Sequence, residues 1–269
     1  MCCMVWVHTV SAGSAEDAWV ELVGKTSEIP PAFAYVENDP ELPNILIYGD
    51  SISIGYTQRV REKLQGKANV YRLHCNGGDS GSFIKKMTHL HTVMRDGNLD
   101  RPWTFQWDVI HFNVGLHDLK YVLNGKNDKI NGKQVASIDT YQANLEGIVA
   151  YLKELSPEAD LIFATTTPVA AGEPGRIVGD AEKYNAAALD VLSKYPEIKI
   201  DDLYKLTKPN QTRWWLKPGN VHYSAMGSNA QGDAVAECIM DALARRAGSA
   251  HPVLKANGAA LSRGTNTHD

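Results

Sequence analysis

Small and polar residues gather at four places in the sequence. They are Gly49-Asp50-Ser51, Asn76-Gly77-Gly78, residues 113–118 and Pro218-Gly219-Asn220-Val221-His222. A serine hydroxyl is a weak nucleophile until a neighbouring base removes its proton, and histidine is the side chain that most often does so. Ser51 and His222 are therefore the candidate nucleophile and general base.

The positions of Ser51 and His222 each allow a second interpretation. Ser51 follows a short apolar run, and a helix starting after it would direct its N-terminus at the hydroxyl, where negative charge is favoured. Serine is also a common helix N-cap. His222 is one of nine histidines, so a histidine in a surface loop is the alternative for it. The chemical interpretation depends on the four segments meeting at one place.

Donors for a developing oxyanion are also present. Gly78 offers a backbone N–H, and the side chain of Asn113 or His117 offers a second donor. Preorganised donors of this kind each contribute about 2.7–4 kcal/mol in the transition state. The alternative roles are a turn glycine for Gly78 and, for Asn113, an amide that satisfies backbone groups at a strand end.

The elements that must position these residues alternate along the chain. Short apolar runs predict strands, and apolar residues at helical spacing predict helices. The predicted strands cover 44–51, 70–75, 107–114, 161–167 and 198–203, and the predicted helices cover 54–66, 82–94, 139–155 (with Asp139 as N-cap), 180–195 and 224–246. This alternation predicts an α/β fold with three layers, α/β/α, around a five-stranded parallel sheet. Ligands in such sheets bind beyond the carboxyl ends of the strands, where the polar segments would meet.

The rest of the chain divides around this pattern. We expect residues 1–43 to be a leader and an N-terminal extension, 44–247 the domain that carries the site, and 248–269 a mobile tail. Residues 16–24 form either a short helix or an edge strand, and residues 124–135 form a loop or a small hairpin. Residues 2–10 are apolar and precede a small-residue segment typical of signal-peptide cleavage, but the basic start of a signal peptide is missing. The sequence therefore favours a secreted or periplasmic protein and leaves a cytoplasmic one open.

Composition argues against several classes of protein. The formal net charge of −4 argues against nucleic acid as the partner, because that partner requires a basic surface. No apolar run approaches the ~18 residues of a membrane span. The four cysteines form no C-x-x-C pair, so a zinc site is not expected.

Taken together, the four polar segments resemble the sequence blocks of the SGNH hydrolases, also called GDSL-type esterases and lipases. Gly49-Asp50-Ser51 matches the block that contains the nucleophile, and residues 76–81 resemble the block whose glycine, here Gly78, helps to form the oxyanion hole. Residues 115–118 resemble the third block, and Val221-His222-Tyr223 resembles the block with the catalytic histidine. The resemblance spans residues 44–245 and implies a flavodoxin-like fold and an acyl-enzyme on Ser51.

The third block departs from the family pattern. It usually reads Gly-x-Asn-Asp, and His117 stands in place of its oxyanion asparagine. A variant group with the third block Phe-Asn-x-Gly-Leu-His-Asp is similar to this chain. That similarity favours Asn113 as the oxyanion donor, beside the N–H groups of Ser51 and Gly78, and leaves His117 to line the pocket.

The fifth block departs as well. It usually reads Asp-x-x-His, but Gly219 stands three residues before His222. The group that orients the histidine is therefore open: a backbone carbonyl near residues 217–220, the Asn220 side chain, or a carboxylate from elsewhere. In the family, the residue at Asp50 precedes the nucleophile and holds local structure rather than the histidine.

The resemblance implies a serine esterase for short acyl esters, above all acetyl esters on carbohydrates, with no metal or organic cofactor. A generic short-chain carboxylesterase and a non-catalytic carbohydrate-binding relative are the alternatives. Trp214 and Trp215, just before the His222 loop, either stack on sugar rings or anchor the loop, and Arg213 beside them either meets an acidic group or is solvated. The expected partner is a small-molecule or carbohydrate ester, and the oligomeric state is not determined by the sequence.

Overall fold

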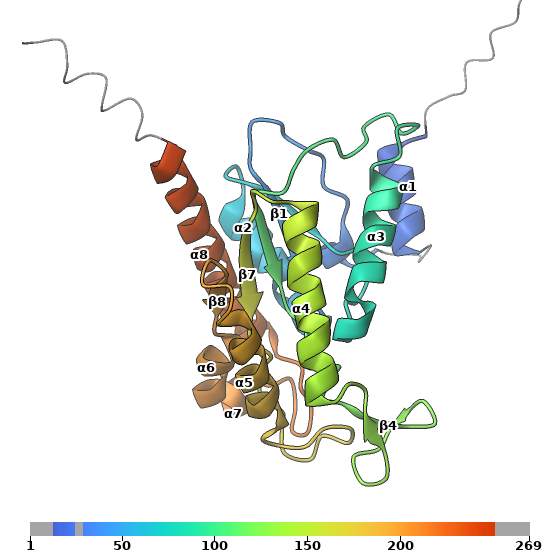
Figure 1. Ribbon diagram of the computed structural model, residues 1–269, viewed down its shortest axis with the longest axis vertical. Coiled ribbons are helices and arrows are strands. Elements are labelled where there is room, and N and C mark those ends of the chain that lie inside the picture. The colour runs from blue at the N-terminus through green and yellow to red at the C-terminus, as the bar shows by residue number, and fades with distance from the viewer. Residues whose placement is uncertain (1–12, 25–28, 251–269) are drawn as a thin grey trace, which may run out of the picture.

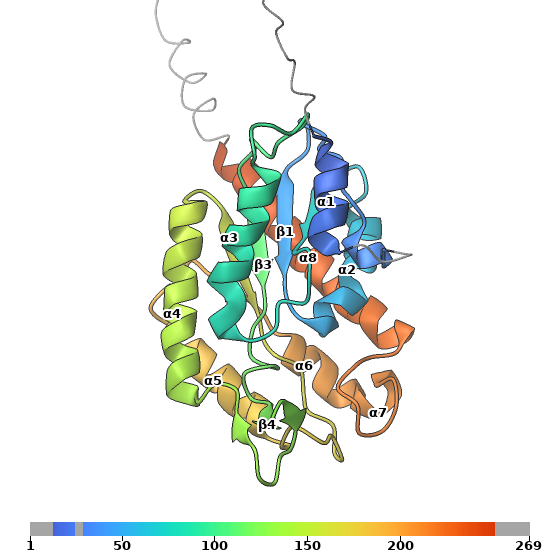
Figure 2. The same cartoon turned by 90° about the vertical axis from the view of Figure 1, so that its right-hand side faces the viewer.

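The computed structural model of the chain describes residues 13–24 and 29–250. Its central element is a five-stranded sheet in the order β2-β1-β3-β7-β8 (Figures 1 and 2). The strands are β1 Asn44–Tyr48, β2 Asn69–Arg72, β3 Val109–Phe112, β7 Asp160–Ala164 and β8 Lys199–Asp201. Every neighbouring pair is parallel, which confirms the predicted sheet.

Helices cover both faces of this sheet, which confirms the three predicted layers. Their bounds are α1 Ala15–Val23, α2 Ser51–Leu64, α3 Phe83–Met94, α4 Ile138–Leu155, α5 Asp180–Leu192, α6 Leu203–Thr207, α7 Gln211–Trp214 and α8 Ala225–Ala250. Helices α2 and α8 pack together against one face, whereas α3 and α4 lie on the other, with α1 packed on α3 and α5 on α4 (Figure 1).

The strand order explains why the helices divide in this way. From β1 the chain moves outward to β2, then crosses back past β1 to β3 and continues to β7 and β8. Because crossovers between parallel strands are right-handed, the two directions of travel place their helices on opposite faces. The direction reverses between β1 and β3, and ligands bind in the crevice at such a switch point.

The middle strands are apolar because both of their faces are covered. Every residue of β1 and of β3 is buried, and β1 pairs with β2 on one side and β3 on the other. Strands buried on both faces have nearly continuous apolar sequences, which is why short apolar runs predicted them. The strands whose ends carry the site are therefore packed on both faces.

Two local expectations differ from the structure. The predicted N-cap Asp139 is wrong: the Ser137 Oγ accepts the Thr140 N–H at 3.2 Å, and Asp139 lies in the first turn of α4. Negative charge is still favourable there because the helix dipole is positive at this end. The helix expected over 54–66 starts earlier, at Ser51, because Asp50 caps it.

The segment between β3 and α4 is more regular than a plain loop. It contains β4 Tyr121–Leu123, β5 Lys126–Asn127 and β6 Lys133–Gln134, which form a small antiparallel sheet in the order β5-β4-β6. This agrees with the hairpin interpretation of residues 124–135. Figure 1 shows this small sheet beyond the carboxyl ends of the central strands, beside the site described below.

The N-terminal extension joins the same core. Of the two predictions for residues 16–24, the helix is confirmed, because helix α1 covers Ala15–Val23 and Gly24 is its C-cap. Trp19 is 2% exposed, with its ring 6.1 Å from that of Trp103. The predicted leader over residues 2–10 lies outside the described residues. The predicted tail over 248–269 is wrong at its start, because residues 248–250 belong to helix α8, and the rest of it lies outside the described residues. Within the described part of the chain, no helix combines the length and the apolar composition that a bilayer crossing requires.

Candidate active site

Ser51 lies at the turn from β1 into α2. The Asp50 side chain is 1% exposed, and its Oδ1 accepts the Ile52 N–H at 2.8 Å, so Asp50 is the N-cap. Ser51 is therefore the first residue of α2, and its backbone N–H makes no hydrogen bond to the described residues. A free N–H at a helix N-terminus stabilises negative charge beside the Ser51 hydroxyl.

Glycines bring the turn after β1 close to the turn after β2. The Gly77 N–H donates to the Gly49 carbonyl at 2.9 Å. A Cβ on Gly77 would lie 2.7 Å from Tyr48 Cε1 and 2.8 Å from Gly49 O, and a Cβ on Gly49 would lie 2.8 Å from Ser53 Oγ. A larger residue at Gly77 would therefore push the two turns apart, and one at Gly49 would collide with the first turn of α2.

Arg72, at the end of β2, holds both turns from inside the protein. Its side chain is fully buried and lies over the Phe33 ring, at 4.6 Å from the ring centroid. Burial lowers the pKa of Arg72 to about 10, which still leaves it charged at neutral pH. Its guanidinium donates to Leu73 O (2.8 Å), Cys75 O (2.9 Å), Gly49 O (3.0 Å), Asp50 O (3.1 Å) and Ser53 Oγ (2.8 Å).

We expect Arg72→Met to lower the free energy of unfolding by about 3 kcal/mol, because several buried carbonyl groups lose their donor. Arg72→Lys should recover only part of this loss, since an ammonium has three donors and cannot serve all five acceptors. Urea denaturation followed by circular dichroism measures both values. Equal midpoints for Arg72→Met and the unsubstituted protein would contradict this role.

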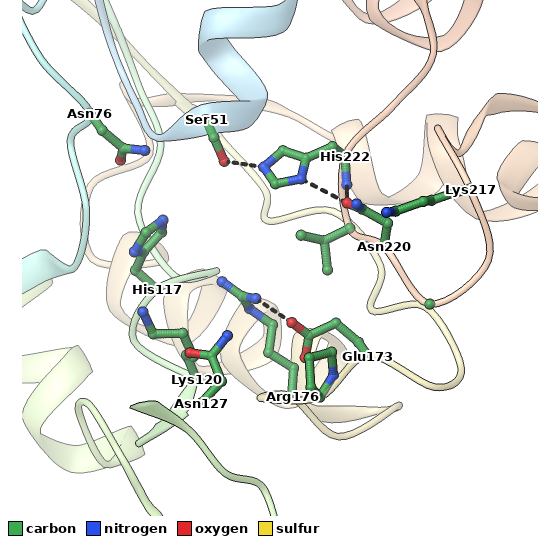
Figure 3. A pocket seen from close by; sticks show the side chains of 13 residues that line it. Ser51, Asn76, His117, Lys120, Asn127, Glu173, Arg176, Lys217, Asn220 and His222 are labelled. Carbon is green, nitrogen blue, oxygen red and sulfur yellow. Dashed lines mark hydrogen bonds and ion pairs between the residues drawn. The ribbon is translucent and has the colours of Figure 1, made fainter. Parts of the chain in front are cut away.

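His222 lies in the loop between α7 and α8 and faces Ser51. Its Nε2 is 2.9 Å from Ser51 Oγ, and its Nδ1 is 2.7 Å from Asn220 Oδ1 (Figure 3). The same Asn220 oxygen accepts the His222 backbone N–H at 2.8 Å. Because an amide oxygen only accepts, Nδ1 carries the proton and Nε2 presents its lone pair to the serine hydroxyl.

The position of the usual family carboxylate is not available here. Gly219 has a φ of +70°, and a Cβ on it would lie 3.3 Å from Gly172 O. A side chain at this position would be strained, whereas Asn220 already contacts the imidazole. Of the orienting groups left open by the sequence, the structure places the Asn220 side chain at His222.

A cavity of about 530 Å³ opens in front of Ser51 and His222. It lies beyond the carboxyl ends of β1, β2, β3 and β7, as expected for this topology. Its polar lining includes the amides Asn76, Asn127 and Asn220, the charged residues Lys120, Glu173, Arg176 and Lys217, and His117. Figure 3 shows Ser51 and His222 on one side of this space, with His117 and Arg176 across it.

Of the residues in the second block, Asn76 lines the cavity and Gly78 does not. The Gly78 N–H donates to Asn76 Oδ1 at 3.0 Å, so this expected oxyanion donor is occupied. Asn76 itself lines the cavity, and Figure 3 shows its amide nitrogen on the side of Ser51. Lys86 fixes the loop by donating to Asn76 O at 2.9 Å and to Gly77 O at 2.8 Å.

In the third block, Asp118 has a structural contact and His117 lines the cavity. Asp118 is fully buried and accepts the Ser80 N–H at 3.0 Å and the Ser80 hydroxyl at 2.5 Å, which ties the third block to the second. Burial raises the pKa of Asp118 to about 6. His117 lines the cavity, and burial lowers its pKa, which favours the neutral ring.

Asn113 does not reach the cavity, contrary to the expectation for the oxyanion donor. Its Nδ2 donates to Ala164 O at 2.7 Å, and the residue lines a separate small cavity with Thr166 and Leu203. It satisfies a backbone group at the end of a neighbouring strand, which is the alternative role considered for it. The sequence could not separate the two roles because both use the same amide.

The two tryptophans also lie outside the cavity lining. Trp214 and Trp215 are half-buried and pack against the hydrophobic core, and Arg213 beside them is exposed. Trp215 pairs with Tyr223 across the two ends of the His222 loop, and Leu216 N–H donates to His222 O at 2.9 Å. The tryptophans anchor the loop, and sugar stacking at the cavity is not supported.

Sequence reasoning missed the charged residues of the cavity. Lys120, Glu173, Arg176 and Lys217 come from three different loops. Charged residues in loops are usually solvated, so nothing in the local pattern distinguishes Lys120, Glu173 and Arg176. Only Lys217 carried a signal, because it lies five residues before His222 in the same loop.

Comparison with known proteins agrees with this arrangement. A sequence profile of the GDSL-like lipase/acylhydrolase family matches residues 47–230. None of the curated proteins compared with the chain matches it.

Several solved structures share the fold. A lipase/acylhydrolase from Enterococcus faecalis has a TM-score of 0.56 and 18% identity, over 73% of this chain and 95% of that one. An acetylxylan esterase from Geobacillus stearothermophilus has a TM-score of 0.53 and 16% identity, over 72% and 92%. A carbohydrate esterase family 2 enzyme from Corynascus thermopiles has a TM-score of 0.53 and 17% identity, over 78% and 69%. At these identities the likeness shows a common fold.

The family match extends over more than half of the chain. It begins within β1, just before Ser51, and ends within α8, just after His222, so it includes all four polar segments. The chain therefore belongs to the GDSL-like lipase/acylhydrolase family and is a serine hydrolase that acts on ester bonds.

Proposed function

We propose that the protein hydrolyses short-chain acyl esters, above all acetyl esters of carbohydrates, through an acyl-enzyme on Ser51. One observation carries this proposal: Ser51 Oγ lies 2.9 Å from His222 Nε2 at the edge of a polar cavity, while Asn220 holds Nδ1 at 2.7 Å. A nucleophile, a base and a group that orients the base are the parts that acyl transfer requires.

The reaction proceeds in two balanced halves. The proton of Ser51 Oγ passes to His222 Nε2 as the oxygen bonds to the ester carbonyl carbon. The bond to the leaving alcohol then breaks, and the alcohol oxygen takes that proton from Nε2. Water repeats the sequence: its proton goes to Nε2, its oxygen bonds to the acyl carbon, and Ser51 Oγ regains the proton as the acid leaves.

The oxyanion of each tetrahedral intermediate needs donors beside Ser51. We assign this role to the Ser51 backbone N–H and the Asn76 amide nitrogen, because the first is unpaired among the described residues and the second lies toward Ser51 (Figure 3). The neutral ring of His117 faces the same space and supplies a further donor. Gly78 supports this arrangement by holding Asn76 through its N–H.

The cavity lining favours a small acyl group and a polar alcohol. Pro174 and Val221 are the hydrocarbon side chains of the lining, and the other side chains there are polar or charged. A long acyl chain would find few hydrocarbon side chains to pack against there, so its hydrophobic gain would be small. Sugar hydroxyls, in contrast, can bond to the amide of Asn127, which lines the same cavity. The similar folds of two carbohydrate esterases are consistent with this choice.

We expect the hydrolysis rate to fall as the acyl chain of the substrate lengthens. The measurement compares kcat/KM for p-nitrophenyl acetate, butyrate and octanoate, and acetate release from acetylated sugars. A fluorophosphonate probe followed by mass spectrometry should place a single adduct on Ser51. A higher kcat/KM for octanoate than for acetate would refute the short-chain proposal, and the lack of an adduct would refute the acyl-enzyme.

A further inference from the structure

The charge of the cavity is not explained by the hydrolysis of a neutral acetyl ester. Three lining residues carry a fixed positive charge, Lys120, Arg176 and Lys217, and Glu173 carries the one negative charge among the lining residues described. Leaving the histidines out of the count, three positive charges less one negative charge give +2, although the whole chain has a formal net charge of −4. A cleft of one sign of charge concentrates ligands of the opposite sign.

Arg176 is built into the wall of the cavity rather than lying on the surface. It is 6% exposed, its Nε donates to Leu116 O at 2.8 Å, and its Nη1 donates to Glu173 Oε1 at 2.8 Å. Glu173 is fixed in turn, because its Oε2 accepts the Gly175 N–H at 2.7 Å. The guanidinium is therefore held in one orientation before any substrate arrives.

One nitrogen of this guanidinium has no partner. Arg176 Nη2 forms no hydrogen bond with the residues that the structure describes, and Figure 3 shows the guanidinium directed into the cavity toward Ser51. This nitrogen is open to the cavity rather than enclosed by the protein, so an acceptor on a ligand can reach it.

Lys120 and Lys217 extend the positive surface on two sides of Arg176. Lys120 lies near His117, and Lys217 lies near Asn220 on the loop of the catalytic histidine (Figure 3). Within residues 13–24 and 29–250, neither ammonium group forms an ion pair or a hydrogen bond. The two lysines therefore remain available to an anion in the cavity.

We propose that the substrate is a short acyl ester of an acidic sugar, whose carboxylate or sulfate group binds to Arg176, Lys120 and Lys217. This inference rests on the proposed function, since the ester carbonyl must lie at Ser51. Because an acetyl group is uncharged, the anion belongs to the alcohol half of the ester. A guanidinium with fixed geometry suits the planar oxygens of a carboxylate and also binds sulfate.

The test compares substrates that differ in charge and little else. Methyl O-acetyl-glucopyranosiduronic acid is paired with its uronamide, which has almost the same shape and no charge. Methyl O-acetyl-glucopyranoside 6-sulfate is paired with the unsulfated glucoside. We expect kcat/KM for acetate release to be about tenfold or more higher for the acid than for the amide, as for one charge-assisted contact. The ratio should fall as salt is added.

Variants of the cationic residues show which groups cause the preference. Arg176→Gln and Lys217→Gln should bring the acid-to-amide ratio toward one, whereas Arg176→Lys should keep part of it. Lys205→Gln is the control, because Lys205 is an exposed lysine on α6 outside the cavity lining, and this variant should keep the full ratio. Lys217 is exposed and unpaired among the described residues, so its variant remains informative even if Arg176→Gln does not fold.

The outcomes separate this inference from the proposed function. If the unsubstituted protein does not hydrolyse p-nitrophenyl acetate, the proposed esterase function is refuted. Hydrolysis with equal kcat/KM for both members of each pair would refute only the acidic substrate. A preference confined to the uronic acid or to the sulfate supports the inference and identifies the anion.

Discussion

Ser51→Ala is expected to reduce the hydrolysis of p-nitrophenyl acetate by roughly 10⁴–10⁶-fold, and His222→Ala by a similar factor. The physical reason is that the two residues act as one unit: the hydroxyl is a poor nucleophile without the base, and the base has no proton to remove without the hydroxyl. Their atoms are 2.9 Å apart, so each depends directly on the other.

The double variant Ser51→Ala/His222→Ala should therefore be no slower than the slower single variant. The initial rates of p-nitrophenyl acetate hydrolysis by the single and double variants are compared at one enzyme concentration. The fluorophosphonate probe titrates the active sites of the unsubstituted protein. Ser193→Ala is the matched control, because the Ser193 Oγ donates to Asp190 O at 2.7 Å on the exposed end of α5, away from the cavity. Losses that multiply in the double variant would show that Ser51 and His222 act independently.

Asn220→Ala is expected to lower kcat by roughly 10²–10³-fold, less than the ~10⁴ that follows loss of a carboxylate orienter. Without the amide oxygen, the imidazole can adopt the tautomer with its proton on Nε2, and that tautomer cannot accept the serine proton. The variant also removes the acceptor for the His222 N–H, which lies 2.8 Å from the same oxygen. The pH profile of kcat and a thermal unfolding scan separate the chemical effect from a loss of structure.

Asn220→Asp is the informative partner of that variant. It keeps an acceptor at the same place and adds a negative charge that stabilises the imidazolium formed in each half-reaction. We expect a higher kcat at alkaline pH, with the acidic limb of the profile moved to higher pH, because a charged imidazole then forms more easily. An unchanged profile would show that a group other than Asn220 orients His222.

We expect Gly219→Asp to lower the hydrolysis rate, although the usual family pattern has aspartate at this position. Aspartate stands at this place in most relatives of the resembled family, but here Gly219 has a φ of +70° and lies close to Gly172 O. The added side chain would strain the loop that carries His222. The positive φ of Gly219 disfavours a side chain at that position, and the neutral amide of the next residue, Asn220, orients His222 instead.

The fold was predictable because its signals are local and repeated. The middle strands β1, β3 and β7 are short, largely apolar runs, and the long helices between strands have apolar residues at helical spacing, so their alternation specifies a parallel sheet without any knowledge of contacts. The errors lie at element ends, where one side chain decides the boundary. Ser137 rather than Asp139 caps α4, since either residue type suits that position.

The candidate site was predictable only in part. Ser51 and His222 stand in separate blocks that the topology brings to one edge of the sheet, and their contact agrees with the expectation. Asn113 donates to Ala164 O instead of lining the cavity, because a side chain at the end of a strand can point to either side of it. Sequence spacing states which residues are near an edge, but not where their side chains point.

By itself the sequence determined the order of the elements, the parallel sheet and the pair Ser51 and His222, because periodicity and motif spacing are properties of the chain. Only the tertiary structure decided that Asn220 holds the imidazole, and that Lys120, Arg176 and Lys217 meet in one cavity. The reason is physical: these residues lie on loops, whose paths depend on packing between distant segments and leave no periodic trace in the sequence.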